Sequence, residues 1–525
     1  FVTRAMKVVE VAHCFLVSLF LIIKTVDCIK SAVVVGAGPA GLASALVLAQ
    51  RHGYQVTVLE AAERTDVYDP TKAYPFLIRE RGQKFTKLFP QVQKALEERG
   101  IATEGATKIV SIPADPKEIL DPEPKTIPVF RPSGKSFWIR RHEFIRLLLD
   151  AAMAEDKITI INGAQCTKIS AIGDSEIEIT TSGSTNQTFV TSLLIGCDGM
   201  KSKVREALAT SPSPFPGWAN NDPDNFKVKR WFSPASGLKF KTLQINAEAK
   251  VPVGDGTMFE IPFDTQTFYA IRSAFKSSKQ AISLGLLPSR KAPVRTFNVI
   301  RLPNHEIWKI KDGEELRQWF ARAFPRFDFS SESSLVDKEE FDRFASTEGL
   351  TLPPCQYSPE LYVVSRNLEA AVILVGDAVH TFPPDLGEGV NSGLEDVLCL
   401  DEALMTHGKL GDVARDYGAQ RGPEAKALVK MVRVGAPFQY QQFGGLLTVR
   451  KLLWTLNFFG RVLLNKMTFG LTPNPVFIQV SDPNLKYSVA LRRADILTAS
   501  LWLITLGALS KIFGIGSRLQ SFLWG

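Results

Sequence analysis

The sequence predicts a mixed α/β protein, in which a nucleotide-binding domain of Rossmann type is interrupted by an antiparallel β-sheet domain and followed by a helical C-terminal region. Three observations predict this arrangement: a strand–helix–strand unit with a glycine-rich turn, a second glycine-rich strand end much further along, and several short strands between them. The expected divisions are a hydrophobic N-terminal segment at 1–30, the nucleotide-binding domain at 31–210 and 346–425, the inserted sheet domain at 211–345, and the helical region at 426–525.

Composition is that of a large globular protein, because 45% of the 525 residues are hydrophobic and 22% are charged. The six cysteines are scattered without a Cys-x-x-Cys pair, which argues against a disulfide scaffold or a zinc site. The formal charge of +8 is concentrated at the C-terminal end, where eleven Lys and Arg and two acidic residues follow residue 429. A basic, apolar end favours an anionic lipid surface over nucleic acid, for which the sequence has no binding motif.

The N-terminal segment contains an uncharged, largely apolar run at Val11–Ile23, preceded by Arg4 and Lys7. Its length suits the core of a signal peptide better than a membrane span, which needs about twenty residues. A retained anchor helix and an ordinary buried helix remain alternatives.

The first nucleotide-binding signal is Gly-Ala-Gly-Pro-Ala-Gly at 36–41, which follows a short β-branched run and opens a helix. In this pattern Gly36 permits a tight turn, Gly38 lets backbone amides approach a pyrophosphate, and Gly41 lets the helix pack on the strand. The helix N-terminus adds unpaired N–H groups and the positive end of a dipole. Glu60 ends the next predicted strand, where a carboxylate can accept both hydroxyls of a ribose.

The second signal is Cys-Asp-Gly-Met-Lys-Ser at 197–202. Asp198 and Gly199 follow a buried strand predicted at 193–197 and precede the basic start of a helix. Two interpretations stand: Asp198 contacts the dinucleotide, or it only caps the helix.

The third signal joins Gly376 and Asp377, at the end of a strand predicted for 371–375, to the glycine-rich loop at 383–391. A carboxylate at a strand end can hold the ribityl hydroxyls of a flavin. The loop can bring backbone N–H groups and a helix N-terminus against the pyrimidine edge of the ring, which becomes negative on reduction. His380 fits a structural hydrogen-bonding role better than a catalytic one.

Between the second and third signals the sequence predicts a separate antiparallel sheet domain for the substrate. A segment rich in Pro, Ser and Asn at 210–225 marks its boundary, and a helix at 314–324 closes it. Six prolines between 112 and 133 predict an irregular excursion from the first domain. The strands expected in the inserted sheet lie at 239–245, 267–272 and 281–286.

Together the motifs GxGxxG, DGxxS and GDxxH with PPxxGxGxN resemble, in order and spacing, those of the class A FAD-dependent monooxygenases of the aromatic-hydroxylase type. Within that class the chain is most similar to the kynurenine 3-monooxygenase family, also in the segments 394–404 and 474–487. The resemblance implies FAD as cofactor and NAD(P)H as a co-substrate without its own Rossmann domain. It also implies that O₂ forms a flavin C4a-hydroperoxide, which passes one oxygen atom to an aromatic or apolar substrate.

The resemblance assigns residues to the cofactor as well. The first motif and Glu60 would hold the ADP half, and Arg141, at the start of a helix, would contact the phosphate region. No catalytic side chain is implied, and the reaction would depend on the flavin-facing loop at Pro384, Gly387 and Gly389. The full cofactor-binding set is Gly36, Gly38, Ala40, Gly41, Glu60, Arg141, Asp198, Gly376, Asp377, Pro384, Gly387, Gly389, Val390 and Asn391.

The residues expected to hold the substrate depart from the family pattern. Kynurenine 3-monooxygenases hold the amino-acid carboxylate with an Arg, a Tyr and an Asn, and Gly105, Val129 and Gly435 stand near these positions. Lys108 and Arg131 are candidate substitutes. Because a buried anion without partners is costly, these losses predict a more apolar substrate than kynurenine.

The flavin-facing loop departs too, since Glu388 replaces the family's Gln and Asp385-Leu386 replaces a Phe pair. Asp385-Leu386-Gly387 is similar to the Asn-Leu-Gly of carotenoid epoxidases of the same class. Epoxidation of an isoprenoid or carotenoid is therefore one alternative, and a non-catalytic FAD-binding membrane protein is another.

Two C-terminal segments predict membrane association. Leu446–Leu464 mixes large apolar residues with basic ones, which is typical of an interfacial helix. Ile496–Leu509 is uncharged and with residues 512–515 reaches about twenty residues, the length of a transmembrane helix; a core helix is the alternative. The resemblance implies a membrane-associated organelle, the mitochondrial outer membrane in that family, with plastid and endoplasmic reticulum left open.

Overall fold

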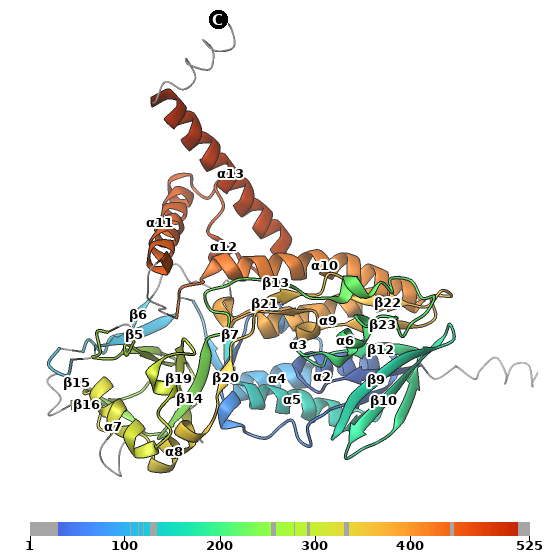
Figure 1. The fold of residues 1–525 in the computed structure, drawn as a ribbon, viewed down its shortest axis with the longest axis horizontal. Helices are drawn as coiled ribbons and strands as arrows, with labels where there is room; N and C mark the ends of the chain where they lie inside the picture. The colour runs from blue at the N-terminus through green and yellow to red at the C-terminus, as the bar shows by residue number, and fades with distance from the viewer. Residues whose placement is uncertain are drawn as a thin grey trace, which may run out of the picture.

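The computed structural model describes residues 30–512 apart from 106, 114, 119, 127–133, 254–258, 278, 291–293, 330–334 and 441–445. The N-terminal run Val11–Ile23, Val129 and Arg131 lie outside the described residues. The described chain forms an α/β domain beside a β-sheet domain, and two C-terminal helices project from this body (Figure 1).

A six-stranded sheet forms the centre of the α/β domain. Its inner strands are short, rich in Val, Ile and Leu, and buried along nearly their whole length, as expected for parallel strands covered on both faces. Only the edge strand β22 runs antiparallel to its neighbour. In sheet order the strands are β22 (Tyr362–Val364), β23 (Ala371–Leu374), β12 (Leu193–Gly196), β1 (Ser31–Val35), β2 (Gln55–Leu59) and β8 (Ile158–Ile161).

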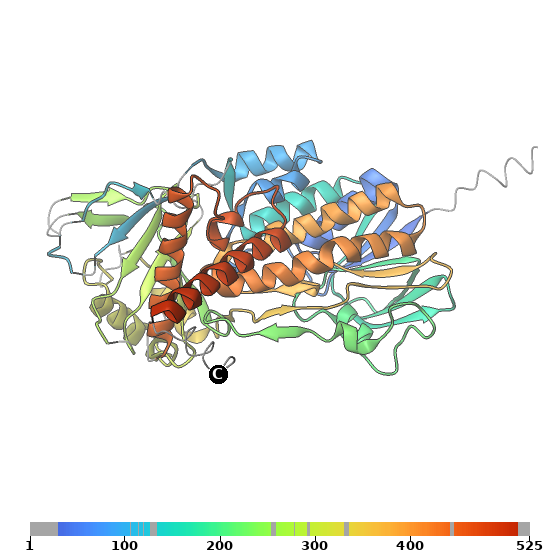
Figure 2. The ribbon, with the colours of Figure 1, turned by 90° about the horizontal axis from the view of Figure 1, so that it is seen from above.

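Helices cover this sheet and carry the glycine-rich signals at their N-termini. α2 (Pro39–Leu46) continues into a π-helical turn at Val47–Arg51 and packs against α5 (Arg141–Met153) and α9 (Gly389–Thr406). α10 (Leu410–Gly435) packs along α9 and the strands β22 and β23. Seen from above, α10 and the C-terminal helices lie on the same face of the molecule (Figure 2).

The second domain is built on a seven-stranded sheet in the order β20-β14-β19-β18-β17-β5-β6. α7 (Gly313–Ala323) and α8 (Lys338–Ser346) pack on it across an aromatic core that includes Phe297, Trp319 and Phe320. The strands are β5 (Lys108–Ile112), β6 (Lys125–Thr126), β14 (Lys239–Ile245), β17 (Phe268–Arg272), β18 (Ser283–Leu286), β19 (Arg295–Arg301) and β20 (Leu350–Thr351).

Strands β5 and β6 come from a segment that the sequence analysis placed in the nucleotide-binding domain. β5 pairs in parallel with β17, and its alternate residues Val110 and Ile112 are buried in the core of the second domain. β6 lies inside the proline-rich stretch that was predicted to be irregular, and it pairs with β5. The prolines flank these two strands and do not interrupt them, so the excursion can supply the edge of the sheet.

Smaller elements connect the two domains and lead into the glycine-rich loops. β7 runs directly into α5, and β24 leads to the flavin-facing loop. The small sheets are β3 (Pro75–Ile78), β7 (Ser136–Arg140) and β4 (Ile101–Thr103); β11 (Thr188–Thr191), β10 (Glu176–Gly183) and β9 (Ala164–Ile172); β13 (Lys229–Trp231), β21 (Cys355–Tyr357) and β24 (His380–Thr381); and β15 (Lys250–Val253) with β16 (Phe259–Pro262). The remaining helices of the body are α3 (Glu80–Thr86), α4 (Pro90–Arg99) and α6 (Lys203–Leu208).

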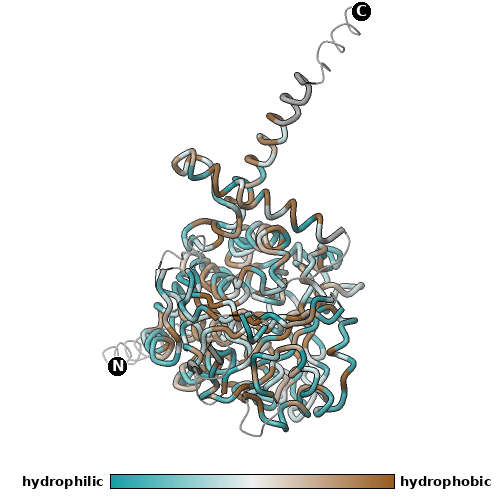
Figure 3. The backbone as a smooth tube through the Cα atoms, turned by 90° about the vertical axis from the view of Figure 1, so that its left-hand side faces the viewer, coloured by the Kyte–Doolittle hydropathy of each residue, from teal (hydrophilic) through white to brown (hydrophobic). Residues whose placement is uncertain are grey.

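The C-terminal region consists of α11 (Leu446–Met467), α12 (Val476–Gln479) and α13 (Tyr487–Ile512). Apolar residues are spread along both projecting helices, α11 and α13 (Figure 3). Across residues 30–512, where described, no helix is both long enough and apolar enough to cross a membrane. The prediction of a transmembrane helix at Ile496–Leu509, extended by residues 512–515, is therefore not supported, and residues 513–515 lie outside the described residues.

Candidate flavin site

The glycine turn lies at the carboxyl edge of the central sheet, where ligands bind in open α/β folds. Gly36 has a φ of +103°, a left-handed conformation that favours glycine. A Cβ on Gly41 would lie 1.8 Å from the carbonyl oxygen of Gly36, so the strand and helix approach too closely for any side chain. Gly38 caps α2, and no protein atom lies within 4 Å of where its Cβ would be. The open space at Gly38 fits a pyrophosphate on the helix N-terminus, and Ala40 follows inside the first turn of α2.

Glu60 is held beside this turn by backbone N–H groups. Its Oε2 accepts a hydrogen bond from the Ala37 N–H at 2.7 Å, and its Oε1 accepts one from the Ala62 N–H at 2.9 Å. Each carboxylate oxygen keeps a further lone pair, which fits the two hydroxyls of a ribose.

Asp198 caps a helix with one carboxylate oxygen and leaves the other oxygen unpaired among the described residues. Its Oδ2 accepts hydrogen bonds from the N–H groups of Lys203 at 2.5 Å and Val204 at 3.1 Å, at the start of α6. Its Oδ1 is buried and has no partner among the described residues, and burial raises the pKa of Asp198. One oxygen therefore caps the helix, while the other is left for a hydrogen-bond donor such as a cofactor hydroxyl.

Arg141 and Asp377, far apart in the sequence, lie close enough to interact electrostatically with each other and with Tyr74. Arg141 begins α5, and its N–H donates to the carbonyl oxygen of Tyr74 at 3.2 Å. Gly376 has a φ of +65°, and Asp377 after it stays exposed although its neighbours are buried. Burial by the surrounding protein raises the pKa of Asp377, whereas the charges of His380 and Arg141 lower it. This pair fits the phosphate and ribityl part of a flavin nucleotide.

His380 is linked to the Gly376 turn through Asp396, which bonds to both. Its Nε2 lies 2.9 Å from Asp396 Oδ2, which also accepts a hydrogen bond from the Gly376 N–H at 2.8 Å. Arg421 Nε donates to Asp396 Oδ1 at 2.8 Å. Burial alone would raise the pKa of Asp396, but His380 and Arg421 outweigh it and lower that pKa to about 2. This buried network favours the structural role that the sequence analysis preferred for His380.

The flavin-facing loop ends in a left-handed Gly387, with a φ of +65°, just before α9 begins at Gly389. Pro384 and Gly389 are exposed, which leaves one side of the loop open to a ligand. Val390 is partly buried against the core of the α/β domain.

Asn391 is buried and holds the loop in place. Its Nδ2 donates to the carbonyl oxygens of Leu77 at 2.9 Å and Gly387 at 3.0 Å, and its Oδ1 accepts from the Arg79 N–H at 2.9 Å. These three hydrogen bonds are all to the protein backbone, so the structure favours a positioning role over direct contact with the cofactor.

The sequence analysis noticed Glu388 as a departure but missed its partners. Glu388 is buried, and its carboxylate accepts hydrogen bonds from Arg79 Nη1 at 2.8 Å and from the hydroxyl of Tyr487 at 2.9 Å. The guanidinium of Arg81 lies 4.3 Å from the centre of the Tyr487 ring and donates to the carbonyl oxygens of Asp482 and Leu485. The flavin-facing loop is thus joined to the start of α13. The Arg-Glu-Arg sequence at 79–81 was the available signal.

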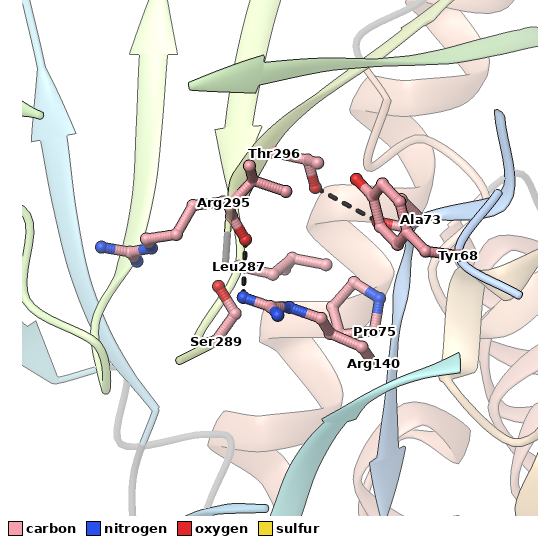
Figure 4. A pocket seen from close by; sticks show the side chains of 9 residues that line it. Tyr68, Ala73, Pro75, Arg140, Leu287, Ser289, Arg295 and Thr296 are labelled. Atoms are coloured by element: carbon pink, nitrogen blue, oxygen red, sulfur yellow. Dashed lines mark hydrogen bonds between the residues drawn. The ribbon is translucent and has the colours of Figure 1, made fainter. Parts of the chain in front are cut away.

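A small pocket lies between the two domains (Figure 4). Arg140 Nη2 donates to the carbonyl oxygens of Val294 at 2.5 Å and Arg290 at 2.7 Å. Thr296 Oγ1 donates to the carbonyl oxygen of Ala73 at 3.2 Å. These bonds join the end of β7 to the start of β19, so the pocket marks the junction of the domains. It is lined by Tyr68, Ala73, Pro75, Arg140, Leu287, Ser289, Val294, Arg295 and Thr296.

The structure also explains why a glycine, Gly435, stands near the position of the family's carboxylate-binding Asn. Gly435 faces the flavin loop, and a Cβ there would lie 2.6 Å from Leu386 Cδ2. Leu386 and Gly435 therefore depend on each other, because a side chain at 435 would have to displace Leu386. Gly105 has open space around it, and Lys108 is exposed on β5.

A family model described as an FAD binding domain matches residues 30–253 and 357–432, which is more than half of the chain. The chain belongs to this family of FAD-binding proteins. It is similar to the kynurenine 3-monooxygenase of Drosophila willistoni, at 23% identity over 505 residues, or 94% of this chain and 96% of the relative. The kynurenine 3-monooxygenase of Salinispora arenicola is 23% identical over 476 residues, or 88% of this chain and 90% of that protein.

Among solved structures, PqsL, a probable FAD-dependent monooxygenase from Pseudomonas aeruginosa, superposes with a TM-score of 0.50 at 18% identity. The match covers 79% of this chain and 97% of PqsL and shows a shared fold. The protein is an FAD-dependent monooxygenase that resembles kynurenine 3-monooxygenase. FAD fits the residues present, because the cradle at Gly38 is open and the buried Asp198 Oδ1 lacks a partner.

Proposed function

We propose that this monooxygenase transfers one oxygen atom from O₂ to an aromatic or otherwise apolar substrate that lacks the carboxylate of kynurenine, with NAD(P)H as reductant. The observation that carries this proposal is the packing of Leu386 against Gly435, since it closes the position near the family's carboxylate-binding Asn. Asp385, buried next to Leu386, adds to it because an ionised carboxyl repels a second carboxylate.

Bound FAD would take a hydride from NAD(P)H and activate O₂. The chain's own residues would hold and orient it, with Glu60 at the ribose and Arg141 and Asp377 along the phosphate and ribityl region. The N-terminus of α9 at Gly389 would stabilise negative charge at the pyrimidine edge. The inserted domain would exclude water from the reacting atoms.

A substrate screen tests this proposal. Oxidation of NADH and NADPH by the purified protein should be stimulated by aromatic compounds without a carboxylate, and kcat/KM for kynurenine should be at least about tenfold lower. Kynurenine as the best substrate would contradict the proposal. Strongest stimulation by an isoprenoid would favour the epoxidase alternative, which the similarity of Asp385-Leu386-Gly387 to the epoxidase loop supports.

We further propose that α11 binds a membrane surface without crossing it, which would place the protein on an organelle membrane. The support is a stripe of apolar residues at helical spacing, each 52 to 68% exposed: Val449, Leu452, Leu453, Leu456, Phe459, Leu463 and Met467. The stripe belongs to the part of the chain with the excess of basic residues, and burying each side chain would contribute about 1.5–3 kcal/mol.

Flotation with phosphatidylserine-containing vesicles tests this association. The protein should float with the vesicles and resist stripping by high salt, since the apolar contribution is not screened. Introducing charge at Leu452→Glu and Leu456→Glu should release it, whereas Val190→Glu, at an exposed apolar position on β11, should not. Full recovery of the unaltered protein in the soluble fraction would contradict the proposal.

A further inference from the structure

Asp385 is a buried acid on the flavin-facing loop, and it forms no ion pair with the described part of the chain. Asp385 is only 2% exposed. Oδ1 accepts a hydrogen bond from Gln439 Nε2 at 3.1 Å, while Oδ2 is buried and has no hydrogen-bond partner among described residues. A buried carboxyl oxygen left unpaired costs free energy, so a native protein that keeps one often supplies its partner from a ligand or water.

The surroundings of Asp385 place it between the cofactor residues and the inserted sheet. Cys355 of β21 and Tyr440, which follows α10, both lie close enough to interact electrostatically with Asp385. Tyr440 packs in a cluster with Phe240 of β14 and with Tyr74. Tyr74 in turn contacts Arg141, which lies beside Asp377. The unpaired oxygen therefore lies in the region where a substrate held between flavin and inserted sheet would end.

We propose that Asp385 is a specificity-determining residue that accepts a hydrogen bond from a nitrogen-bearing group of the substrate, an amine or a ring N–H. The inference rests on the proposed function and deepens it by naming the substrate class, apolar aromatic compounds that carry such a nitrogen. A carboxyl oxygen without a donor is satisfied by an N–H group, whereas a substrate carboxylate would meet like charge there.

The ionisation of Asp385 is expected to make the binding of a cationic amine depend on pH. Burial raises its pKa to about 7, against a smaller lowering by Gln439. Burial also raises the pKa of Cys355 to about 12 and that of Tyr440 well above its usual value. Arg433 is the cation near Cys355, and its Nε donates to the carbonyl oxygen of Phe232, just after β13, at 3.0 Å. Asp385 is then the group facing this region that ionises near neutral pH, so binding of a cationic amine should strengthen above about pH 7.

Ligand binding to the FAD-loaded protein tests the assignment with three matched probes: phenethylamine, phenethyl alcohol and hydrocinnamate. Their dissociation constants can be measured from the perturbation of the flavin absorption spectrum at pH 6 and pH 8. At pH 8 the unaltered protein should bind the amine about tenfold more tightly than the carboxylate. Asp385→Asn keeps the acceptor for Gln439 and should remove this preference and its pH dependence. Asp412→Asn, at a partly exposed position on α10, should change neither.

The outcomes separate this inference from the proposed function. FAD content and the rate of flavin reduction by NAD(P)H are measured on the same preparations, and loss of either in the unaltered protein would count against the proposed function alone. Equal affinity for amine and carboxylate, no binding of the amine, or an unchanged preference in Asp385→Asn would each overturn the role of Asp385. The comparison of the three probes on the unaltered protein does not depend on any variant folding.

Discussion

At the scale of single residues, Gly38 and Gly408 form a matched pair for testing the cofactor turn. Neither has a protein atom within 4 Å of its missing Cβ, so a larger residue leaves the fold undisturbed at both positions. Gly38→Leu should place its side chain where the pyrophosphate lies and remove bound FAD, while Gly408→Leu should keep it. The flavin content of the purified proteins measures this, and full occupancy in Gly38→Leu would show that the turn is wrongly assigned.

Asp396 offers a test through stability and pH. Its pKa is lowered to about 2, so it contributes stability above about pH 4 that is lost as pH falls through about 2. The shift corresponds to about 2 kcal/mol, and removing one partner of a buried pair costs about 3–5 kcal/mol.

Chemical unfolding should therefore show Asp396→Asn to be less stable by about 2–5 kcal/mol at pH 7, with a difference that narrows between about pH 4 and pH 2. Asp416→Asn, which removes a partly exposed pair with His407, should cost less than about 1 kcal/mol. Equal stability of Asp396→Asn and the unaltered protein at pH 7 would contradict the buried network.

Residue roles were predictable where the motif itself fixes the chemistry. The glycine turn and Glu60 are local, so strand, helix and acid can be read from adjacent residues. Asn391 and Glu388 were harder, because their partners Leu77, Arg79 and Tyr487 come from elements far away in the sequence. The charged sequence at 79–81 shows that partners are needed, but it does not show that Glu388 and Tyr487 are those partners.

At the scale of elements, the contact between α13 and the flavin-facing loop predicts different results for two truncations. Ending the chain after residue 490 removes the apolar run of α13 but keeps Tyr487, so FAD should stay bound. Ending it after residue 480 also removes the carbonyl oxygens that accept hydrogen bonds from Arg81 and the Tyr487 hydroxyl that donates to Glu388. Loss of hydrogen bonds to buried charged groups is costly, so this shorter protein should lose thermal stability and flavin.

Thermal unfolding and flavin content of the two truncated proteins measure the difference. If both retain flavin and unfold at the same temperature, the contact between Tyr487 and Glu388 does not support the loop.

Elements with clear periodicity were predictable from sequence, and those set by long-range pairing were not. The buried strands at 193–196 and 371–374 and the helix after Gly389 appear close to their expected bounds. β5 and β6 were missed, because their place beside β17 depends on a partner more than a hundred residues away. The run Ile496–Leu509, which lies in α13, was expected to be a membrane span on hydropathy alone, but no helix of the described residues is long and apolar enough to cross a membrane.

At the scale of the whole molecule, the α/β domain carries the cofactor motifs and the inserted sheet domain packs beside them. The α/β domain brings together the three motif segments 36–41, 197–202 and 376–391 at one edge of a mostly parallel sheet, and this part was predictable because each segment follows a buried strand. The inserted sheet approaches that edge through Phe240, Tyr74 and the junction at Arg140. The substrate chemistry depends on this meeting of domains, which no single segment of the sequence encodes.

The central claim is that the protein is an FAD-dependent monooxygenase, and incorporation of labelled oxygen tests it most directly. The FAD-loaded protein is supplied with NAD(P)H, ¹⁸O₂ and the best substrate of the screen, and the product is analysed by mass spectrometry. The account predicts one ¹⁸O atom per product molecule, one NAD(P)H consumed for each, and no product without O₂. A product that carries no label, or that forms anaerobically by loss of hydrogen, would contradict it and indicate a dehydrogenase on the same fold.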